Sequence, residues 1–497
     1  MKKTFVSILV SAAVVLTLSS CNDWLQASSS TRIQQEKLLT NRDGFLDALT
    51  GVYLTMGSHS LYGEALTWHF ADLICYPYNE VAATDTHPWQ AHSYTNTYVK
   101  NDVAGMWTTA YNVIANINSV LDYLDSRRNV FTSELEFNLV KGELLGLRAF
   151  VHFDLIRLFG TCGWAQSEEA KITVPYVTEF SPQATPQRTN AQTRDLLLAD
   201  LSAAIDCLKA DPITGVVPDG WNQGPNAEGY WNKRNTHFNL YAARMLEARV
   251  YQWSGDLTHA AELAQGIIDD AIGSGAVEWI DAEAQINTLD NSARNWTFTV
   301  EQLFQLDVTG LHSNVTTVLI AGLSSDLDAL HIKEEFVGEV LYKLNDNGYI
   351  GGAEDIRGTA MMLKYNRGGY DCYKLYGTSS TPLAFRNKMP IMKLSELYMM
   401  IAENYLDQGD LLKVKETLNT IRSHRGIQSD LPATADATAE FYKEIMREFI
   451  NEGQIVYWFK RKGLDNYPGA GYFDVQLSDL TLPYPQAEIN YGRTQEL

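Results

Sequence analysis

The chain has 497 residues, of which 45% are hydrophobic, and this is enough apolar material for one very large domain or several ordinary ones. Its formal charge of −21 and the absence of a basic block make nucleic acid and anionic lipid poor partners. The five cysteines form no C-x-x-C motif, which argues against a zinc site and a dense disulfide framework.

The first twenty residues have the pattern of a secretory signal peptide. Two lysines precede an apolar run that ends near Leu16 and is too short to span a bilayer. Small residues end at Ser20, directly before Cys21, and this arrangement looks like a bacterial lipoprotein box. We therefore expect cleavage before Cys21 and lipidation of its thiol, with segment 22–30 as a leash. An ordinary signal peptide with an incidental cysteine is the alternative.

Hydrophobic periodicity predicts a mainly helical chain with minor β-strand. Apolar residues at three-to-four spacing predict helices or helix pairs over 105–126, 134–159, about 190–208, 236–271 and 390–424. Alternating residues predict a short strand within 296–308 and a weaker one over 339–345. Cys75, Cys162, Cys207 and Cys372 are expected to be buried free thiols, although a disulfide remains an alternative in an exported protein.

Two of the helix pairs carry an internal repeat. Residues 248–257 and 402–411 share Ala, Tyr, Gly, Asp and Leu at the same five positions. The small Ala lets a neighbouring helix approach, and the Gly-Asp pair turns the chain and caps the next helix. This pattern is typical of a tetratricopeptide-like helix hairpin. The copies lie far apart, so long insertions separate the helix pairs.

Several segments carry longer motifs in a fixed order along the chain. They are Cys21–Leu25, KGELLGLRAFVHFDLIRLFG (141–160), NKMPIMKLSELYMMIAENYLDQGD (387–410), the Leu-Asn, Ile-Arg and Arg-Gly pairs within 418–426, REFINEGQIVYWFKRKG (447–463) and LPYPQAEI (482–489). Together they resemble the SusD/RagB family of outer-membrane lipoproteins, which capture nutrients in gut and oral Bacteroidetes. Gln454 and the segment 457–460 depart from the family pattern, which puts only local packing in question.

The resemblance implies one compact α-helical protein with four tetratricopeptide-like helix pairs and loops that form a ligand site. After the signal peptide (1–20), it implies an N-terminal SusD-like region (21–230) and a C-terminal RagB/SusD region (231–497). It also implies a SusC-like TonB-dependent barrel transporter as partner, over which the lipoprotein acts as a lid. The protein would be lipid-anchored in the outer membrane and face the cell exterior.

Charged residues inside the motif helices could be mistaken for catalytic acids or phosphate clamps. They are Glu143, Arg148, Asp154, Arg157, Glu396, Glu403, Arg422, Arg447 and Glu448. We expect them to pair with one another or to cap neighbouring helices, because buried charges are retained when paired.

A hydrolase is the rival interpretation, because glycosidases need only two suitably placed carboxylates. The sequence contains no H-E-x-x-H, G-x-S-x-G or P-loop motif. His87 and His92 have no helical spacing that would hold one metal, and segment 326–328 lacks the rest of a calcium loop. We therefore expect a binding protein with no enzymatic activity, no metal and no cofactor.

Aromatic residues concentrate in the insertions at 60–100, 218–235 and 365–376. Rigid aromatic faces stack on the apolar faces of sugar rings, while amides at the rim bind hydroxyl groups. The first candidates for ligand contact are Trp68, Trp89, Tyr94 and Asn96, and the second are Trp221, Tyr230 and Trp231. These aromatics could instead belong to the core or bury against the transporter.

The composition of the loops favours a glycan as ligand. A peptide, bound as by a RagB-like protein, is the alternative, and the net acidity keeps cationic peptides open. A pure protein-interaction scaffold is a third class, which the lipid anchor and long loops disfavour.

Overall fold

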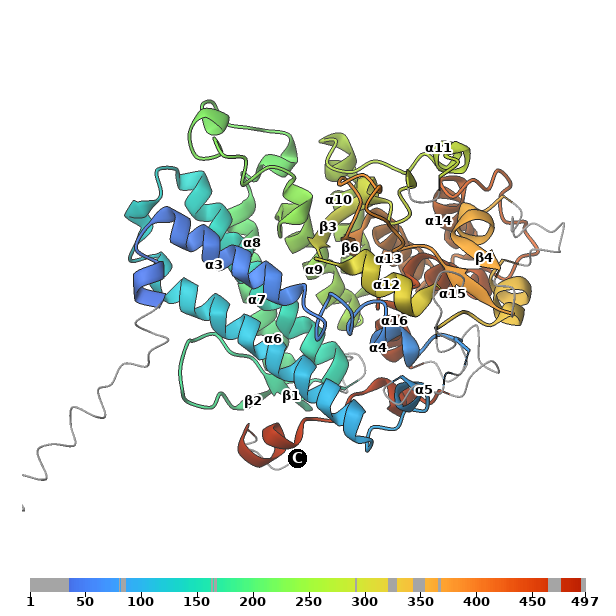
Figure 1. The fold of residues 1–497 in the computed structure, drawn as a ribbon, viewed down its shortest axis with the longest axis horizontal. Coiled ribbons are helices and arrows are strands. Elements are labelled where there is room, and N and C mark those ends of the chain that lie inside the picture. The colour runs from blue at the N-terminus through green and yellow to red at the C-terminus, as the bar shows by residue number, and fades with distance from the viewer. Residues whose placement is uncertain are drawn as a thin grey trace, which may run out of the picture.

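A computed structural model describes residues 35–79, 81, 86–161, 164, 168–290, 293–320, 329–342, 354–364, 368–463 and 475–492. The expected signal peptide, Cys21 and the leash at 22–30 lie outside the described residues, as do Cys162, Tyr365 and segment 326–328. Figure 1 confirms the predicted fold class, since helix pairs make up the body and strands are few and short.

Four long helices form the N-terminal part of the scaffold, namely α3 (Arg42–Met56), α6 (Thr97–Leu124), α7 (Glu134–Phe159) and α8 (Asn190–Leu208). The helix α7 packs against the other three and is buried on nearly every side, so it is the central helix. The expected bounds of α7 and α8 are confirmed. The helix predicted at 105–126 begins earlier, because the Asn96 side chain accepts a hydrogen bond from the Tyr98 backbone N–H and caps α6.

Two helix hairpins form the C-terminal part. They are α9 (Leu240–Trp253) with α10 (Leu257–Gly273), and α13 (Leu394–Asp407) with α14 (Leu411–Ser423). Both hairpins turn at a glycine in the left-handed region, Gly255 at φ 87° and Gly409 at φ 74°. The aspartate that follows each glycine caps the next helix. Because α10 packs against α13, the predicted repeat is confirmed as two adjacent hairpins of the same design.

The described strands form two-stranded antiparallel sheets. The pairs are β1 (Ile172–Pro175) with β2 (Gln187–Thr189), β3 (Gln302–Asp307) with β6 (Lys388–Lys393), and β4 (Met362–Lys364) with β5 (Tyr370–Cys372). The strand predicted within 296–308 is confirmed by β3. The helix predicted from residue 390 begins only at Leu394, because Pro390 lies in β6 opposite Gln305 and cannot donate within a helix. The strand expected at 339–345 is wrong for 339–341, which belong to a π-helix over Phe336–Leu341.

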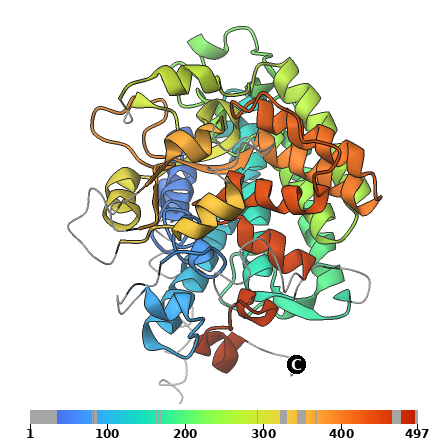
Figure 2. The same ribbon diagram turned by 90° about the vertical axis from the view of Figure 1, so that its right-hand side faces the viewer.

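Shorter helices complete the described part of the chain. They are α4 (Phe70–Leu73), α5 (His87–Gln90), α11 (Ala282–Asn287), α12 (Leu311–Leu319), α15 (Ala437–Phe449) and α16 (Ile455–Lys462). Figures 1 and 2 show the C-terminal segment beside α5 and the start of α6. There the Tyr484 ring meets the Trp107 ring edge-on, with centroids 5.5 Å apart. One hydrophobic cluster runs from Leu39 to Leu482, whereas the boundary expected at residue 230 stays a prediction.

The charged residues of the motifs are paired inside the scaffold, as predicted. The pairs are Arg148–Asp200, Arg157–Asp154, Arg234–Glu143, Arg249–Glu396, Arg461–Glu403 and Arg447–Glu444. Glu448 accepts hydrogen bonds from Arg425 at 2.7 Å and from Arg357 at 2.6 Å. Burial opposes ionisation of Glu448, but these cations and Lys393 outweigh it and hold its pKa well below the usual value. Arg422 donates to the Ser429 carbonyl at 3.2 Å.

Three of the expected thiols can be assessed. Cys75, Cys207 and Cys372 are free, and Cys75 and Cys372 are buried, whereas Cys207 is only partly buried. Burial raises the pKa of Cys372 to about 12, so its thiol stays protonated at neutral pH. Among the described residues, no helix combines the length and apolar character needed to cross a membrane.

The tight packing around α7 predicts that an added methyl group destabilises the protein. A Cβ atom at Gly146 would lie 2.2 Å from Cε1 of the buried Phe238 ring. We expect Gly146→Ala to lower the free energy of unfolding by about 1–3 kcal/mol, because the ring must shift inside a packed core. The measurement is a urea titration followed by tryptophan fluorescence.

The matched control is Gly51→Ala in α3, where an added Cβ would meet no atom within 4 Å. Alanine is the better helix former, so this variant should be neutral or more stable by up to about 1 kcal/mol. Equal effects of the two substitutions would contradict the packing argument.

Candidate functional site

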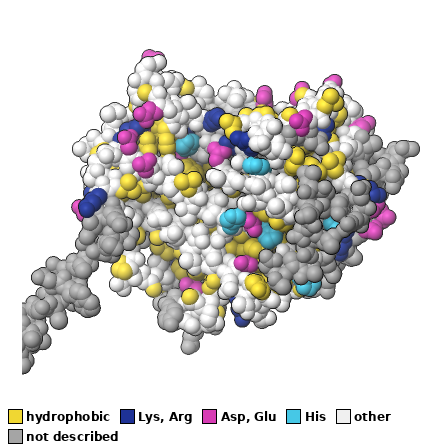
Figure 3. Space-filling view, in the orientation of Figure 1, with side chains coloured by type: hydrophobic (Ala, Val, Ile, Leu, Met, Phe, Trp, Pro, Cys, Tyr) yellow, Lys and Arg dark blue, Asp and Glu magenta, His cyan; other side chains and the backbone are white. Residues whose placement is uncertain are grey.

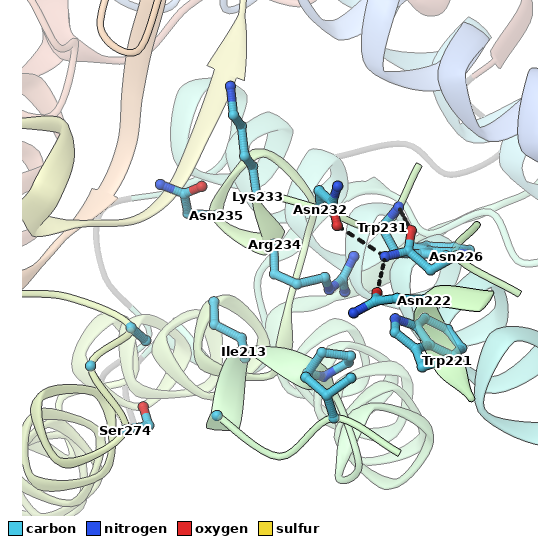
Figure 4. A pocket seen from close by; sticks show the side chains of 15 residues that line it. Ile213, Trp221, Asn222, Asn226, Trp231, Asn232, Lys233, Arg234, Asn235 and Ser274 are labelled. Carbon is cyan, nitrogen blue, oxygen red and sulfur yellow. Dashed lines mark hydrogen bonds between the residues drawn. The ribbon is translucent and has the colours of Figure 1, made fainter. Parts of the chain in front are cut away.

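The loop between α8 and α9 forms an open cavity of about 420 Å³ (Figure 4). Three short 3-10 helices shape the loop, namely η3 (Pro212–Thr214), η4 (Trp221–Gln223) and η5 (Arg234–Thr236), and residues 274–276 after α10 close the far side. The lining residues are Pro212, Ile213, Gly215, Val217, Trp221, Asn222, Asn226, Trp231, Asn232, Lys233, Arg234, Asn235, Ser274, Gly275 and Ala276. The cavity therefore combines two indole rings with four carboxamides.

The sequence builds this loop from tight turns. Gly215 ends η3 at φ 81° and Gly220 begins η4 at φ 75°, and both angles favour glycine. Lys233 adopts a left-handed conformation at φ 53° although it has a side chain. Such residues persist only where the surrounding structure holds them in place.

A buried ionic cluster fixes the loop to α7. Arg234 donates to Asp211 at 2.8 and 2.7 Å and to Glu143 at 2.5 Å. Glu143 also accepts a hydrogen bond from the Tyr53 hydroxyl at 2.6 Å and lies 3.1 Å from Nδ1 of His237. Burial alone would raise the pKa of Glu143, but His237 and Arg234 outweigh this effect and lower it. Asp211 and Arg234, near the two ends of the loop, are thus joined to Glu143 of the central helix in one ionic cluster.

A second carboxylate of α7, that of Glu136, forms a hydrogen bond with Trp231 in the wall of the cavity. Glu136 Oε1 accepts hydrogen bonds from the Trp231 indole at 2.9 Å and from Arg42 at 3.0 Å. Arg42 also donates to the Pro225 carbonyl at 2.7 Å, so α3 reaches the same loop. Both contacts connect residues far apart in the sequence and hold the Trp231 ring in one orientation.

Three asparagines form a hydrogen-bonded row along the cavity, drawn as dashed lines in Figure 4. The buried Asn226 accepts the Trp231 backbone N–H at 2.8 Å. Its Nδ2 atom donates to Oδ1 of Asn222 at 3.0 Å and to Oδ1 of Asn232 at 2.9 Å. Asn235 and Lys233 are seen at the left of Figure 4, on the side opposite Trp221 and Asn222. The polar side chains that line the cavity are therefore neutral amides, the Ser274 hydroxyl and two cations.

The structure brings together the second group of predicted site residues. Trp221 and Trp231 line the cavity, although their rings are 4% and 1% exposed and act as walls. Tyr230 packs edge-on against Trp231, with ring centroids 4.8 Å apart, and its hydroxyl donates to the Leu46 carbonyl at 3.2 Å. Tyr230 thus supports the wall from behind.

The first group of predicted site residues does not line this cavity. Trp68 is 1% exposed and donates its indole N–H to the Gly63 carbonyl at 2.9 Å. Trp89 is 1% exposed, stacks on Phe70 with centroids 4.6 Å apart and donates to Asp102 at 3.0 Å.

The two other residues of that group have partners of their own. The half-buried Tyr94 donates to the Asp479 carbonyl, and Asn96 caps α6. Packing or capping thus accounts for all four positions, and their contact with a ligand stays a prediction.

The sequence did single out the segment 218–235, but for its aromatics alone. The polar lining residues Asn222, Asn226, Asn232, Lys233 and Asn235 were not recognised. Their signal was present, because the fourteen residues 222–235 contain four asparagines. Asparagine is also common in turns, however, so its density alone does not distinguish a binding loop from a tight turn.

A second cavity of about 630 Å³ lies at the turn between α6 and α7. Its lining includes Asp125, Arg128, Glu134 and Phe137. Arg128 pairs with Glu134 and covers the Phe137 ring, and Asp125 pairs with Lys141 at 2.7 Å. Because these charged side chains already bind one another, the loop cavity is the better candidate for ligand binding.

Comparison with known proteins agrees with this architecture. Residues 23–218 match the model of a SusD-like family described as "Starch-binding associating with outer membrane". The N-terminal part of the chain, residues 23–218, is therefore similar to this SusD-like family. Among curated proteins none is similar enough to count as a match.

Solved structures of SusD proteins share the fold over nearly the whole chain. A SusD superfamily protein from Bacteroides thetaiotaomicron is 22% identical, with a TM-score of 0.70, and the match covers 90% of this chain and 98% of that one. A SusD superfamily protein from Bacteroides vulgatus is 20% identical, with a TM-score of 0.70, covering 92% and 98%. A SusD-like carbohydrate binding protein from Bacteroides vulgatus is 13% identical, with a TM-score of 0.66, covering 91% and 98%. At these identities the likeness establishes the fold of this chain.

The buried cluster predicts how stability depends on pH. Because the pKa of Glu143 is lower in the folded protein than its usual value of 4.5, the ionised carboxylate stabilises the fold above that pH. We expect Glu143→Gln to lower the free energy of unfolding at pH 7 by about 3 kcal/mol, because Arg234 and His237 lose a buried partner. The difference should begin to shrink as the pH falls below about 4.5 and should disappear below the lowered pKa of Glu143, where the wild-type carboxyl is neutral in the folded protein as well.

The measurement is a series of urea titrations between about pH 7 and pH 3. The control is Glu262→Gln, which neutralises an exposed carboxylate on α10. A pH-independent difference between wild type and Glu143→Gln would contradict the assignment of the charge to Glu143.

Proposed function

We propose that the protein captures an oligosaccharide or polysaccharide at the outer membrane and delivers it to a SusC-like TonB-dependent transporter. The observation that carries the proposal is the cavity in the loop 212–235, whose walls combine two indole rings with a row of asparagines. The family model that matches residues 23–218 is described as starch-binding and outer-membrane-associated, and one structure of similar fold is that of a SusD-like carbohydrate binding protein.

The chemistry of the cavity suits a sugar. A sugar ring has hydroxyl groups that both donate and accept hydrogen bonds, and apolar C–H faces that pack on aromatic rings. Asn222 and Asn232 are exposed at the cavity and offer carboxamide groups. Such binding needs side chains held in place but no ionisable group with a shifted pKa. The contacts of Glu136 and Glu143 supply that rigidity from behind.

A peptide ligand, the alternative within the same architecture, finds less support. Peptides are often bound as an added strand, which requires an unpaired sheet edge. The residues that line this cavity come from 3-10 helices and the turns between them. They therefore provide side-chain groups for a ligand, whereas backbone pairing would require a different surface.

Binding is also better supported than hydrolysis. A glycosidase needs two carboxyl groups that flank the scissile bond. The residues that line this cavity include no Asp or Glu, and the carboxylates behind it are engaged by Arg234, Trp231 and Arg42. The cavity can therefore hold a glycan without the groups that would cleave it.

The distribution of surface charge bears on which partners the protein could bind. On the face in Figure 3 charged side chains lie singly or in small groups. Such a face presents no broad basic patch of the kind that binds nucleic acid. We place the protein on the outer membrane through a lipid on Cys21, facing the cell exterior, where it would cover the transporter as a lid. A pure interaction scaffold would leave the loop cavity without a use.

The proposal predicts that single asparagines contribute to glycan affinity. We expect Asn222→Ala and Asn235→Ala each to weaken binding about fivefold, because each loses a hydrogen bond that contributes about 1 kcal/mol. The measurement is titration calorimetry of the purified protein against a panel of polysaccharides, oligosaccharides and peptides.

The matched control is Asn112→Ala, which removes an exposed asparagine from α6. Unchanged affinity in both loop variants would contradict the site, and binding of peptides alone would contradict the ligand class. Release of reducing sugar during the incubation would contradict the absence of catalysis.

The proposed anchor gives a prediction about location. We expect Cys21→Ser to move the protein from the outer-membrane fraction to the soluble fraction, because the serine hydroxyl cannot take the thioether-linked lipid. Cell fractionation with immunoblotting is the measurement. Cys207→Ser, which changes a thiol inside α8, should leave the distribution unchanged. Membrane association that survives Cys21→Ser would show that another segment anchors the chain.

A further inference from the structure

We propose that the loop cavity selects an anionic saccharide, one that carries carboxylate or sulfate ester groups. This inference rests on the proposed glycan-binding function and adds the chemical class of the sugar. It follows from the direction in which the asparagine side chains point and from the charges that line the cavity.

The orientation of Asn226 is fixed by a backbone group. The Trp231 backbone N–H can only donate, and it lies 2.8 Å from the Asn226 side-chain oxygen. The amide nitrogen of Asn226 must therefore point the other way. Because that nitrogen can only donate, the side-chain atoms 3.0 Å away on Asn222 and 2.9 Å away on Asn232 are oxygens.

This chain of contacts fixes the orientation of two exposed amide groups. With their oxygens held by Asn226, Asn222 and Asn232 leave their NH₂ groups for other partners. Both residues are exposed, whereas Asn226 is 5% exposed and stays behind them. One buried asparagine thus converts two ambivalent side chains into hydrogen-bond donors.

The charges of the residues that line the cavity also favour an anionic ligand. Two cations and no carboxylate are among the lining residues, in a chain with 60 acidic and 39 basic residues. Arg234 is paired with two carboxylates, those of Asp211 and Glu143, whereas the exposed Lys233 forms no ion pair with the described residues. The exposed acidic residues of the loop, Asp219 and Glu228, do not line the cavity.

A ligand at this site therefore meets N–H donors and one unneutralised ammonium group. Carboxylate and sulfate oxygens only accept hydrogen bonds and carry negative charge, so they match both properties. A neutral sugar would use the donors but gain nothing from Lys233. A cationic peptide would face groups of its own kind, which disfavours it by charge repulsion.

The test compares matched glycans by titration calorimetry of the purified protein. The probes are an oligogalacturonide, its carboxyl-reduced neutral counterpart and a sulfated oligosaccharide of similar length. We expect the anionic probes to bind at least about tenfold more tightly than the neutral one, and the two anionic arms show which group is preferred.

Two variants separate the contributions of the asparagine row and the charge. Asn226→Asp keeps the size of the side chain but accepts where the amide donated, so Asn222 and Asn232 should turn their oxygens outwards and the preference for anions should vanish. Lys233→Asn removes the charge with a residue that tolerates the left-handed conformation, and should weaken anionic probes about tenfold and the neutral one little. Lys100→Asn removes an exposed lysine from α6 and should change neither.

The outcomes distinguish this inference from the function on which it rests. Equal affinity for the reduced and acidic probes would overturn the preference for anions and leave glycan binding intact. Failure of all glycans to bind would overturn both. If Asn226→Asp fails to fold, an unchanged preference in Lys233→Asn would still overturn the inference.

Discussion

The arrangement of the loop that forms the cavity depends on two buried carboxylates of α7, those of Glu136 and Glu143. Each lies 0% exposed and is satisfied only by groups that belong to other elements. Removal of one partner from such a cluster leaves a buried charge unpaired, which destabilises a protein by several kcal/mol. The loop that forms the cavity is therefore tied to the central helix as firmly as one helix to another. Because the side of the loop that faces α7 is rigid, the side chains that face the cavity can keep a defined arrangement.

Different residues fix the loop to the scaffold and line the cavity. The cavity can therefore differ between proteins that share this scaffold. The residues that face the helices, Arg234, Trp231 and Asp211, are constrained by charge and burial. The residues that face the cavity, Asn222, Asn232 and Lys233, are exposed and form no ion pair with the described residues. Structures with as little as 13% identity keep the fold over 91% of this chain, which shows how much sequence change the scaffold accepts.

The helices could be predicted from the sequence because their signals are local. Stripes of apolar residues and the Thr189 cap define α8, and the Gly-Asp turns define both hairpins. The strand β6 could not be predicted in this way, because its partner β3 lies far away in the sequence. The same limit applied to the site. Trp89 and Trp231 both occur in aromatic loops, yet Phe70 covers one and Glu136 turns the other towards a cavity. Which side of a loop residue is buried depends on tertiary contacts that no local pattern contains.

An acidic protein that binds an anionic sugar requires an electrostatic explanation. The charge of −21 repels an anion at long range, but interactions between exposed charges are screened beyond about 8 Å at physiological ionic strength. Near the cavity the ligand therefore responds mainly to the groups it can touch, and these are the NH₂ groups of Asn222 and Asn232 and the ammonium of Lys233. Hydrogen bonds act only at contact and require the correct orientation. The oriented amides and Lys233 together thus supply selectivity for an anion where the overall field supplies none, without a cluster of cations that would bind any polyanion.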